Sequence, residues 1–128
     1  MTVAATPMDR VEHFLSVYTA RDVEGVVACY ADSESIAAIG TDRVQNYVGR
    51  EAIRKGMADD FLSFDKAEID IVWHNAGEDG NTAWVVAACR ALFALEQEEV
   101  HVAIRLSAVL KRYENDWLLL QTHFSFPS

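Results

Sequence analysis

The chain has 128 residues, of which 51% are hydrophobic, and its formal net charge is −9, from 20 acidic and 11 basic residues. A chain of this length fits one domain and can bury about two thirds of the surface that its unfolded form exposes. The acidic balance opposes binding to nucleic acid or to an anionic membrane, because both need clustered Lys and Arg. No apolar run reaches the ~18 to 20 residues that span a membrane, and residues 1–8 lack a signal pattern. We therefore expect a cytoplasmic chain with one domain over residues 1–128.

The N-terminal third of the chain predicts two helices. Thr6 offers a hydroxyl cap, Pro7 suits the first helical position, and Asp9 follows three residues after the cap. Apolar residues then recur at helical spacing to about residue 20. Asp22 resembles a second cap, and it precedes a short apolar stripe over residues 23–30.

The middle of the chain predicts two short strands and a third helix. Residues 34–40 are rich in Ile and Ala and indicate a strand, and residues 45–48 indicate another after a polar turn at 41–43. Gly49 begins a helix whose inner side carries apolar residues at helical spacing: Ile53, Met57, Phe61 and Phe64.

The C-terminal half predicts four strands over residues 67–75, 82–95, 101–112 and 117–126. The intervening segments are the turn at 77–81, the charged connection at 96–99 and the turn at 114–116. Such short connections require antiparallel neighbours, since parallel pairing needs a long crossover. The sequence therefore predicts an α+β fold in which three helices pack on one face of a mostly antiparallel sheet of about six strands.

The cysteines and histidines give no metal-site or redox pattern. Cys29 and Cys89 lie in apolar surroundings, which is typical of small buried residues, and they form no CxxC pair. The four histidines lie on four different predicted elements. We expect no metal, no cofactor and no disulfide.

Three segments of the chain resemble the NTF2-like superfamily. Residues 20–32, after Val11–Phe14, resemble its opening helices, and residues 49–53 are similar to the start of its third helix. The ending, with Trp117, His123 and Ser125 in the pattern Trp-x5-His-x-Ser, resembles the SnoaL-like branch. It also resembles the association domain of calcium/calmodulin-dependent kinase II.

The resemblance implies a cystatin-like cone, in which a curved sheet wraps around the three helices and leaves a pocket at its open end. It also implies a homodimer formed through the sheet. It does not fix an activity, because this fold hosts isomerases, dehydratases, hydrolases, transport factors and scaffold domains.

The catalytic set of the ketosteroid isomerase-like members has no counterpart here. An ungapped alignment of the opening places Phe14 where that family carries its tyrosine and Ala38 where it carries its base. The position of the family's acid falls near Ser107. Phenyl and methyl groups neither donate nor abstract a proton, so this chemistry is poorly supported.

Polar residues on the later strands are the remaining candidates for the pocket. Arg105 and Ser107 share one face of their strand, as His123 and Ser125 do on the next, while Arg90 interrupts an apolar run. We expect Arg105 and His123 to hold an anionic or carbonyl-bearing small molecule, since guanidinium donates two parallel hydrogen bonds to carboxylates. The alternative is that the arginines pair with acids across the sheet, because the alternation does not reveal which face is concave.

Aromatic residues at regular spacing are more typical of a core than of a pocket. We expect Tyr47 and Trp84 to line the pocket, because they lie on strands near its mouth. We expect the other aromatic residues at regular spacing to pack in the core: Tyr18, Tyr30, Phe61 and Trp73.

Three functions remain open at this point. The first is a small-molecule-binding homodimer that lacks catalysis. The second is a SnoaL-like isomerase, dehydratase or hydrolase that uses His123 with Arg105 as catalytic residues. The third is a self-association module, indicated by the kinase-like ending.

Overall fold

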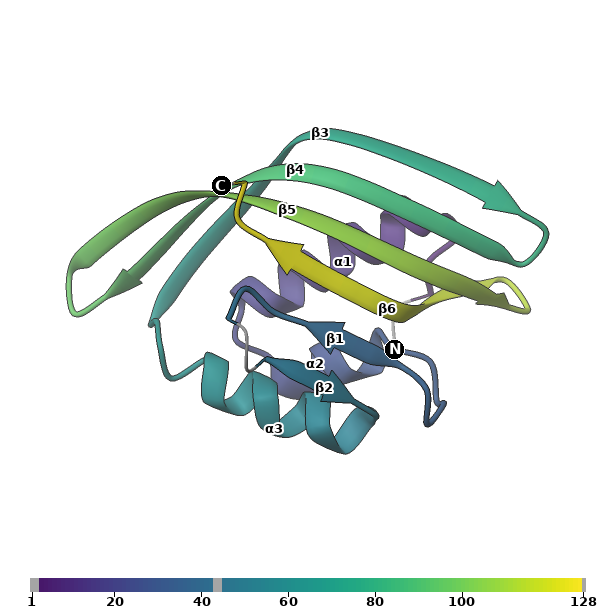
Figure 1. The fold of residues 1–128 in the computed structure, drawn as a ribbon, viewed down its shortest axis with the longest axis horizontal. Helices are drawn as coiled ribbons and strands as arrows, with labels where there is room; N and C mark the ends of the chain where they lie inside the picture. The colour runs from purple at the N-terminus through teal and green to yellow at the C-terminus, as the bar shows by residue number, and fades with distance from the viewer. Residues whose placement is uncertain (1–2, 43–44, 128) are drawn as a thin grey trace.

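The computed structural model describes residues 3–42 and 45–127. Within them the chain forms three helices and six strands, in the order α1 (Pro7–Thr19), α2 (Val23–Ala28), β1 (Ala37–Ile39), β2 (Asn46–Val48), α3 (Arg50–Asp60), β3 (Lys66–Asp79), β4 (Thr82–Leu95), β5 (Glu98–Tyr113) and β6 (Asp116–Ser125). The long strands arch over the helices, which lie together against one side of the sheet (Figure 1). The predicted α+β fold, with helices on one face of a curved sheet, is confirmed.

The helices begin where the sequence predicts. The Thr6 hydroxyl accepts a hydrogen bond from the Asp9 amide, and the Asp22 carboxylate accepts one from the Gly25 amide. Each contact satisfies an amide that the first helical turn leaves unpaired. None of the described helices has the length and apolar character needed to cross a membrane.

The six strands form one sheet in the order β2-β1-β6-β5-β4-β3. All neighbours are antiparallel except β1 and β6, which pair in parallel. The parallel pair inserts the last strand between the two short N-terminal strands and the long meander. A continuous wall therefore extends from β2 to β3.

Two strands are longer than the sequence predicts. β3 continues through Gly77, and the chain reverses only at Gly80, which has φ +62°. β5 begins at Glu98, so only Glu96 and Gln97, both at positive φ, remain in the connection that was expected over 96–99. The predicted turn at 41–43 includes residue 43, which lies outside the described residues.

Irregular register in two places changes which side chains face the helices. An extra residue, Val72, interrupts the pairing of β3 with β4, and Leu120 does the same in the pairing of β5 with β6. Such bulges bend a strand and increase its twist. The Val72 bulge also reverses the alternation, so that Trp73 is 58% exposed and the prediction that it packs in the core is wrong.

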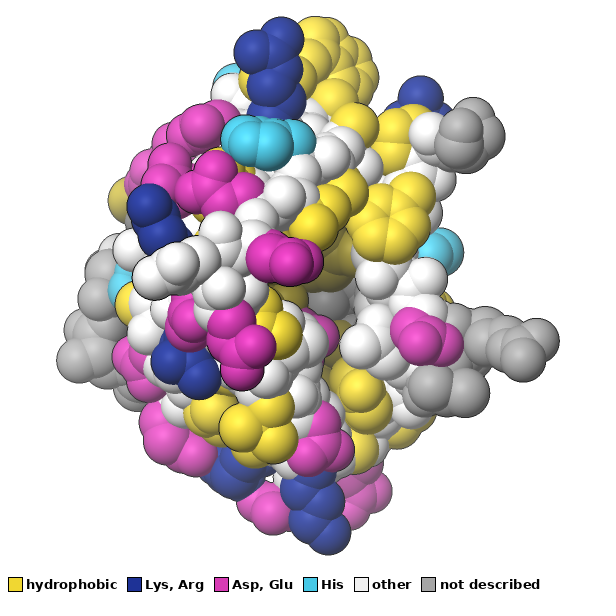
Figure 2. Space-filling model, turned by 90° about the vertical axis from the view of Figure 1, so that its left-hand side faces the viewer, with side chains coloured by type: hydrophobic (Ala, Val, Ile, Leu, Met, Phe, Trp, Pro, Cys, Tyr) yellow, Lys and Arg dark blue, Asp and Glu magenta, His cyan; other side chains and the backbone are white. Residues whose placement is uncertain are grey.

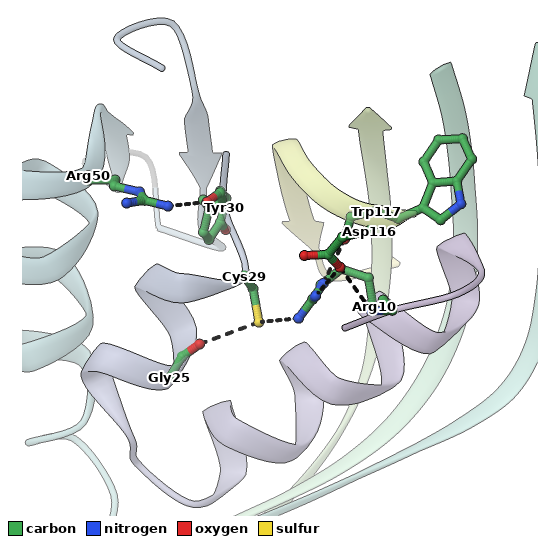
Figure 3. Close-up of polar contacts among 8 residues, drawn as sticks. Arg10, Gly25, Cys29, Tyr30, Arg50, Asp116 and Trp117 are labelled. Carbon is green, nitrogen blue, oxygen red and sulfur yellow. Dashed lines mark hydrogen bonds and ion pairs between the residues drawn. The ribbon is translucent and has the colours of Figure 1, made fainter. Parts of the chain in front are cut away.

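The helices cover the inner face of the sheet with an apolar core that includes Tyr30, Trp117 and both cysteines. A buried arginine joins this core to the sheet: Arg10 Nε donates to the Trp117 carbonyl at 2.7 Å, and Nη2 donates to Asp116 Oδ1 at 2.8 Å (Figure 3). The ion pair therefore fixes α1 against the first residues of β6.

Candidate functional site

A cavity of about 280 Å³ lies between the inner face of the sheet and the helices. Figure 2 views the side on which the β4–β5 hairpin projects and shows a hollow bordered by hydrophobic side chains. Most of the lining is apolar, contributed by Phe14, Ala38, Ile39, Met57, Phe64, Ile69, Phe93, Val100, Val102, Ile104, Phe124 and Phe126. Its size is close to the lower end of the range for small-molecule sites.

Three neighbouring strands supply one row of this lining. Tyr47 of β2 pairs with Ala38 of β1, and Ala38 pairs with Thr122 of β6, so their side chains share the inner face. The inserted position of β6 is therefore what places residues from the two ends of the chain on the same wall.

A tyrosine and a carboxylate meet in the cavity. Tyr18 of α1 donates a hydrogen bond from its hydroxyl to Asp60 Oδ2 at the end of α3. Burial, followed by the charge of Asp60 and this hydrogen bond, raises the pKa of Tyr18 above its ordinary value of 10.0. Tyr18 is therefore a neutral donor at physiological pH, held by an acceptor that also lines the cavity.

A second hydroxyl pair lies deeper. The hydroxyls of Tyr30 and Thr122 are 2.6 Å apart, and both residues are buried. Burial raises the pKa of Tyr30, while the hydrogen bond to Thr122 opposes that rise. Because each hydroxyl has the other as a hydrogen-bond partner, neither is left without one when an apolar part of a ligand lies at this end of the cavity.

Tyr47 lies closely against α3. A Cβ atom built on Gly56 would be 2.5 Å from the Tyr47 ring, so only glycine allows this approach. Burial, together with the carboxylates of Asp60 and Asp59, raises the pKa of Tyr47. The helix surface thus sets the position of one aromatic wall of the cavity.

Two phenylalanine rings and the Tyr18 ring form a stacked wall. The Phe14 and Phe124 rings are 6.0 Å apart between centroids with an interplanar angle of 27°, and the Tyr18 ring stacks on both. Flat faces of this kind favour a planar apolar partner through offset stacking.

Six of the seven site residues predicted from the sequence do not line this cavity, and Tyr47 is the one that does. The other six are Trp84, Arg90, Arg105, Ser107, His123 and Ser125, and all but the half-buried Ser125 are exposed. Their neighbours on the same strands, such as Ile104 and Thr122, face inward. The expectation that Arg105 and His123 point into the cavity is therefore corrected: the concave face is the opposite one.

The structure nevertheless brings several of these residues together. His123 pairs with Ser107 across β5 and β6, and Arg105 pairs with Ser125 two positions away. With Trp73, Trp84, Val86 and Arg90 they lie on what we call the outer sheet face. We define this face by Trp73, Trp84, Val86, Arg90, Arg105, Ser107, His123 and Ser125.

Of the three positions compared with ketosteroid isomerase, two line the cavity and one does not. Phe14 and Ala38 both line the cavity, although neither carries a polar group. Ser107 is exposed on the outer sheet face, so the inward position on β5 belongs to Ile104 and the buried Leu106. That proton-transfer set is thus replaced by apolar side chains.

Asp60 was not predicted as a site residue from the sequence, and Tyr18 was expected in the core. A signal for Asp60 existed, because it lies three residues after Met57 and hence on the inner side of α3. An acid on an apolar helix face must find a donor or solvent, and here it finds the Tyr18 hydroxyl.

Comparison with known protein families identifies one family for most of the chain. The family model described as SnoaL-like domain matches residues 8–128. No curated protein matches the chain significantly.

Solved structures show the same fold at low sequence identity. An NTF2-like superfamily protein from Salmonella enterica has a TM-score of 0.84 at 15% identity, over 94% of this chain and 87% of that one. A Thiobacillus denitrificans protein, provisionally described as a calcium/calmodulin-dependent protein kinase type II association domain, has a TM-score of 0.80 at 19% identity over the whole of both chains. A Streptomyces avermitilis protein, provisionally described as a dehydratase of the NTF2-like family, has a TM-score of 0.81 at 15% identity, over 93% of this chain and 92% of that one.

Proposed function

Because the chain belongs to the SnoaL-like domain family, we propose that it binds a mainly apolar, ring-containing small molecule in the cavity between its sheet and its helices. The observation that carries the proposal is the cavity itself, whose lining is mainly apolar and includes stacked aromatic rings. Burying an apolar ring there removes its surface from water, which is the main favourable contribution to binding of this kind.

Filling the cavity tests the proposal. Ala38 faces inward between Tyr47 and Thr122, so Ala38→Leu adds volume where the ring of a ligand would lie. We expect naphthalen-2-ylmethanol, a neutral probe, to raise the melting temperature of the wild type and to have a much smaller effect on this variant. Differential scanning fluorimetry, with melting in the absence of probe as reference, measures both.

Ala103→Leu is the matched control. Ala103 lies on β5 between the inward-facing Val102 and Ile104, and it is exposed. The same added volume there should leave the effect of the probe unchanged. Equal loss in both variants, or no effect of the probe on the wild type at saturating concentration, contradicts binding in this cavity.

An enzyme function is the second candidate, and the Tyr18–Asp60 pair favours it. The pair supplies a carboxylate that the Tyr18 hydroxyl orients at one cavity wall, and a carboxylate is one of the groups that act as a general base. His123 and Arg105, the residues predicted for catalysis, are exposed on the other face. The provisional description of the Streptomyces avermitilis relative as a dehydratase gives the reaction to assay: loss of water from a ring-containing alcohol, with Asp60→Asn expected to abolish turnover.

The proposal also includes a homodimer formed through the outer sheet face. Trp73 and Trp84 on this face are 58% and 43% exposed, and Val86 lies on the same side of the sheet. Exposed clusters of large apolar side chains are typical of protein–protein contact surfaces. A description as an association domain, given to the Thiobacillus denitrificans relative, agrees with this use of the fold.

A further inference from the structure

Asp60 is the only charged residue among the cavity-lining residues that the structure describes. It lies on a wall that otherwise consists of apolar, hydroxyl and amide side chains. An anion bound in this cavity would meet a like charge at short range, whereas a cation would meet an opposite one. This arrangement is the reverse of the arginine-lined pocket that the sequence predicts.

The Asp60 carboxylate retains an acceptor for a ligand. Its Oδ2 atom accepts the Tyr18 hydroxyl, and within the described residues its Oδ1 atom has no hydrogen-bond partner. An ionised carboxylate accepts hydrogen bonds on both oxygens. The Tyr18 contact therefore orients the carboxylate and leaves one oxygen available on a half-buried side chain.

A second carboxylate adds to the negative potential near Asp60, while the Arg21 guanidinium donates to the carbonyl of the next residue, Phe61. Asp59 precedes Asp60 on α3, and both carboxylates contribute to the raised pKa of Tyr47, behind the effect of burial. Figure 2 shows acidic side chains near the hollow. The rings of Tyr18 and Tyr47 border the same space, and aromatic rings attract cations.

We propose that the cavity selects a protonated amine carried on a mainly apolar ring, with the ammonium group donating a hydrogen bond to Asp60. The ring would lie against the wall formed by Phe14 and Phe124, whose stacked faces suit a planar partner. This inference rests on the proposed function, since it assigns a ligand class to the same cavity.

Three probes with one ring system test the selection on the wild-type protein. They are naphthalen-2-ylmethylamine, naphthalen-2-ylmethanol and naphthalene-2-carboxylate, which present a cation, a neutral hydroxyl and an anion. We expect the amine to bind about tenfold more tightly than the alcohol at pH 7, because its ammonium group carries a charge opposite to that of Asp60, and the carboxylate to bind most weakly. Isothermal titration calorimetry gives the three dissociation constants.

Two variants that each remove one carboxylate charge test whether Asp60 causes the preference for the amine. Asp60→Asn removes the charge but keeps an acceptor for Tyr18, so amine affinity should fall about tenfold, to the level of the alcohol. Asp59→Asn removes the same charge from an exposed position that does not line the cavity, and it should retain most of the amine preference. Circular dichroism and the melting temperature without probe show that each variant is folded.

The outcomes separate this inference from the proposed function. Binding of the carboxylate as tight as that of the amine, or equal losses in both variants, overturns amine selection and leaves cavity binding in place. If none of the three probes binds the wild type, the proposed function itself fails, and amine selection fails with it. The wild-type comparison decides the question even if Asp60→Asn does not fold.

Discussion

The Tyr30 hydroxyl lies in the interior and has Thr122 as its hydrogen-bond partner. Burial raises the pKa of Tyr30 in the folded protein above its ordinary value of 10.0. Above pH 10 the unfolded chain therefore loses the Tyr30 proton while the folded chain keeps it. The contribution of Tyr30 to stability is present below pH 10 and is lost as the pH rises, by about 1.4 kcal/mol per pH unit.

The variant Tyr30→Phe should not show the loss of stability that Tyr30 causes above pH 10. At pH 7 we expect the variant to be less stable by about 1 to 3 kcal/mol, because Thr122 loses its partner. Between pH 10 and 11 its deficit should shrink, since it no longer has a phenol to ionise on unfolding. Urea unfolding at each pH measures this, with Tyr113→Phe, at an exposed tyrosine, as the control expected to follow the wild type. A deficit that stays constant with pH contradicts the argument.

At the scale of elements, the contact between α3 and β2 controls one wall of the cavity. Helix propensity alone predicts that Gly56→Ala stabilises α3 by about 1 kcal/mol. The new Cβ would lie 2.5 Å from the Tyr47 ring, so the ring or the helix must move. We expect a net loss of about 1 to 3 kcal/mol, as for overpacked cores, together with weaker binding of the naphthalene probes.

A double-mutant cycle checks the cause of this effect. In a Tyr47→Ala background the ring is absent, so Gly56→Ala should become neutral or stabilising. Chemical denaturation of the four proteins gives the coupling free energy. The same loss with and without the ring would show that Tyr47 is not what excludes alanine at position 56.

Helix positions were predictable because their signals are local. Thr6 and Asp22 accept hydrogen bonds from amides within one turn, so the caps that they form need no tertiary context. The antiparallel meander followed equally from short connections. The pairing of β1 with β6 did not follow from the residues themselves, since no local pattern specifies a contact between Ala38 and Thr122.

The residues that line the cavity were harder to predict than the helices, because the alternation of side chains along a strand is the same whichever face of the sheet the helices cover. Period-two spacing groups Arg105 with Ser107, but it does not say whether they face helices or solvent. The polar residues were expected inside because a ligand was expected to need them. The helices instead cover the face that carries Ile104 and Leu106, as apolar burial requires.

At the scale of the whole molecule, the outer sheet face determines the proposed homodimer. Trp73→Glu places a charge among the exposed apolar side chains of this face, and it should weaken the dimer by at least about tenfold. Size-exclusion chromatography with light scattering over a concentration series measures the shift. Leu62→Glu is the matched control, because Leu62 is 75% exposed after the end of α3 and away from this face. A monomeric wild type, or equal behaviour of both variants, contradicts the proposed interface.

The insertion of β6 between β1 and β5 also has a consequence for how the protein forms during synthesis. Tyr30 and Thr122 are 92 positions apart in sequence, and their contact closes the deep end of the cavity. The β1–β2 hairpin and the hairpins of β3, β4 and β5 use short-range pairing and can form early, whereas the two parts join into one sheet only after the last strand leaves the ribosome. A nascent chain that ends before residue 116 therefore lacks the strand that joins the β1–β2 hairpin to the meander, so the inner side of the sheet stays partly uncovered until β6 is added.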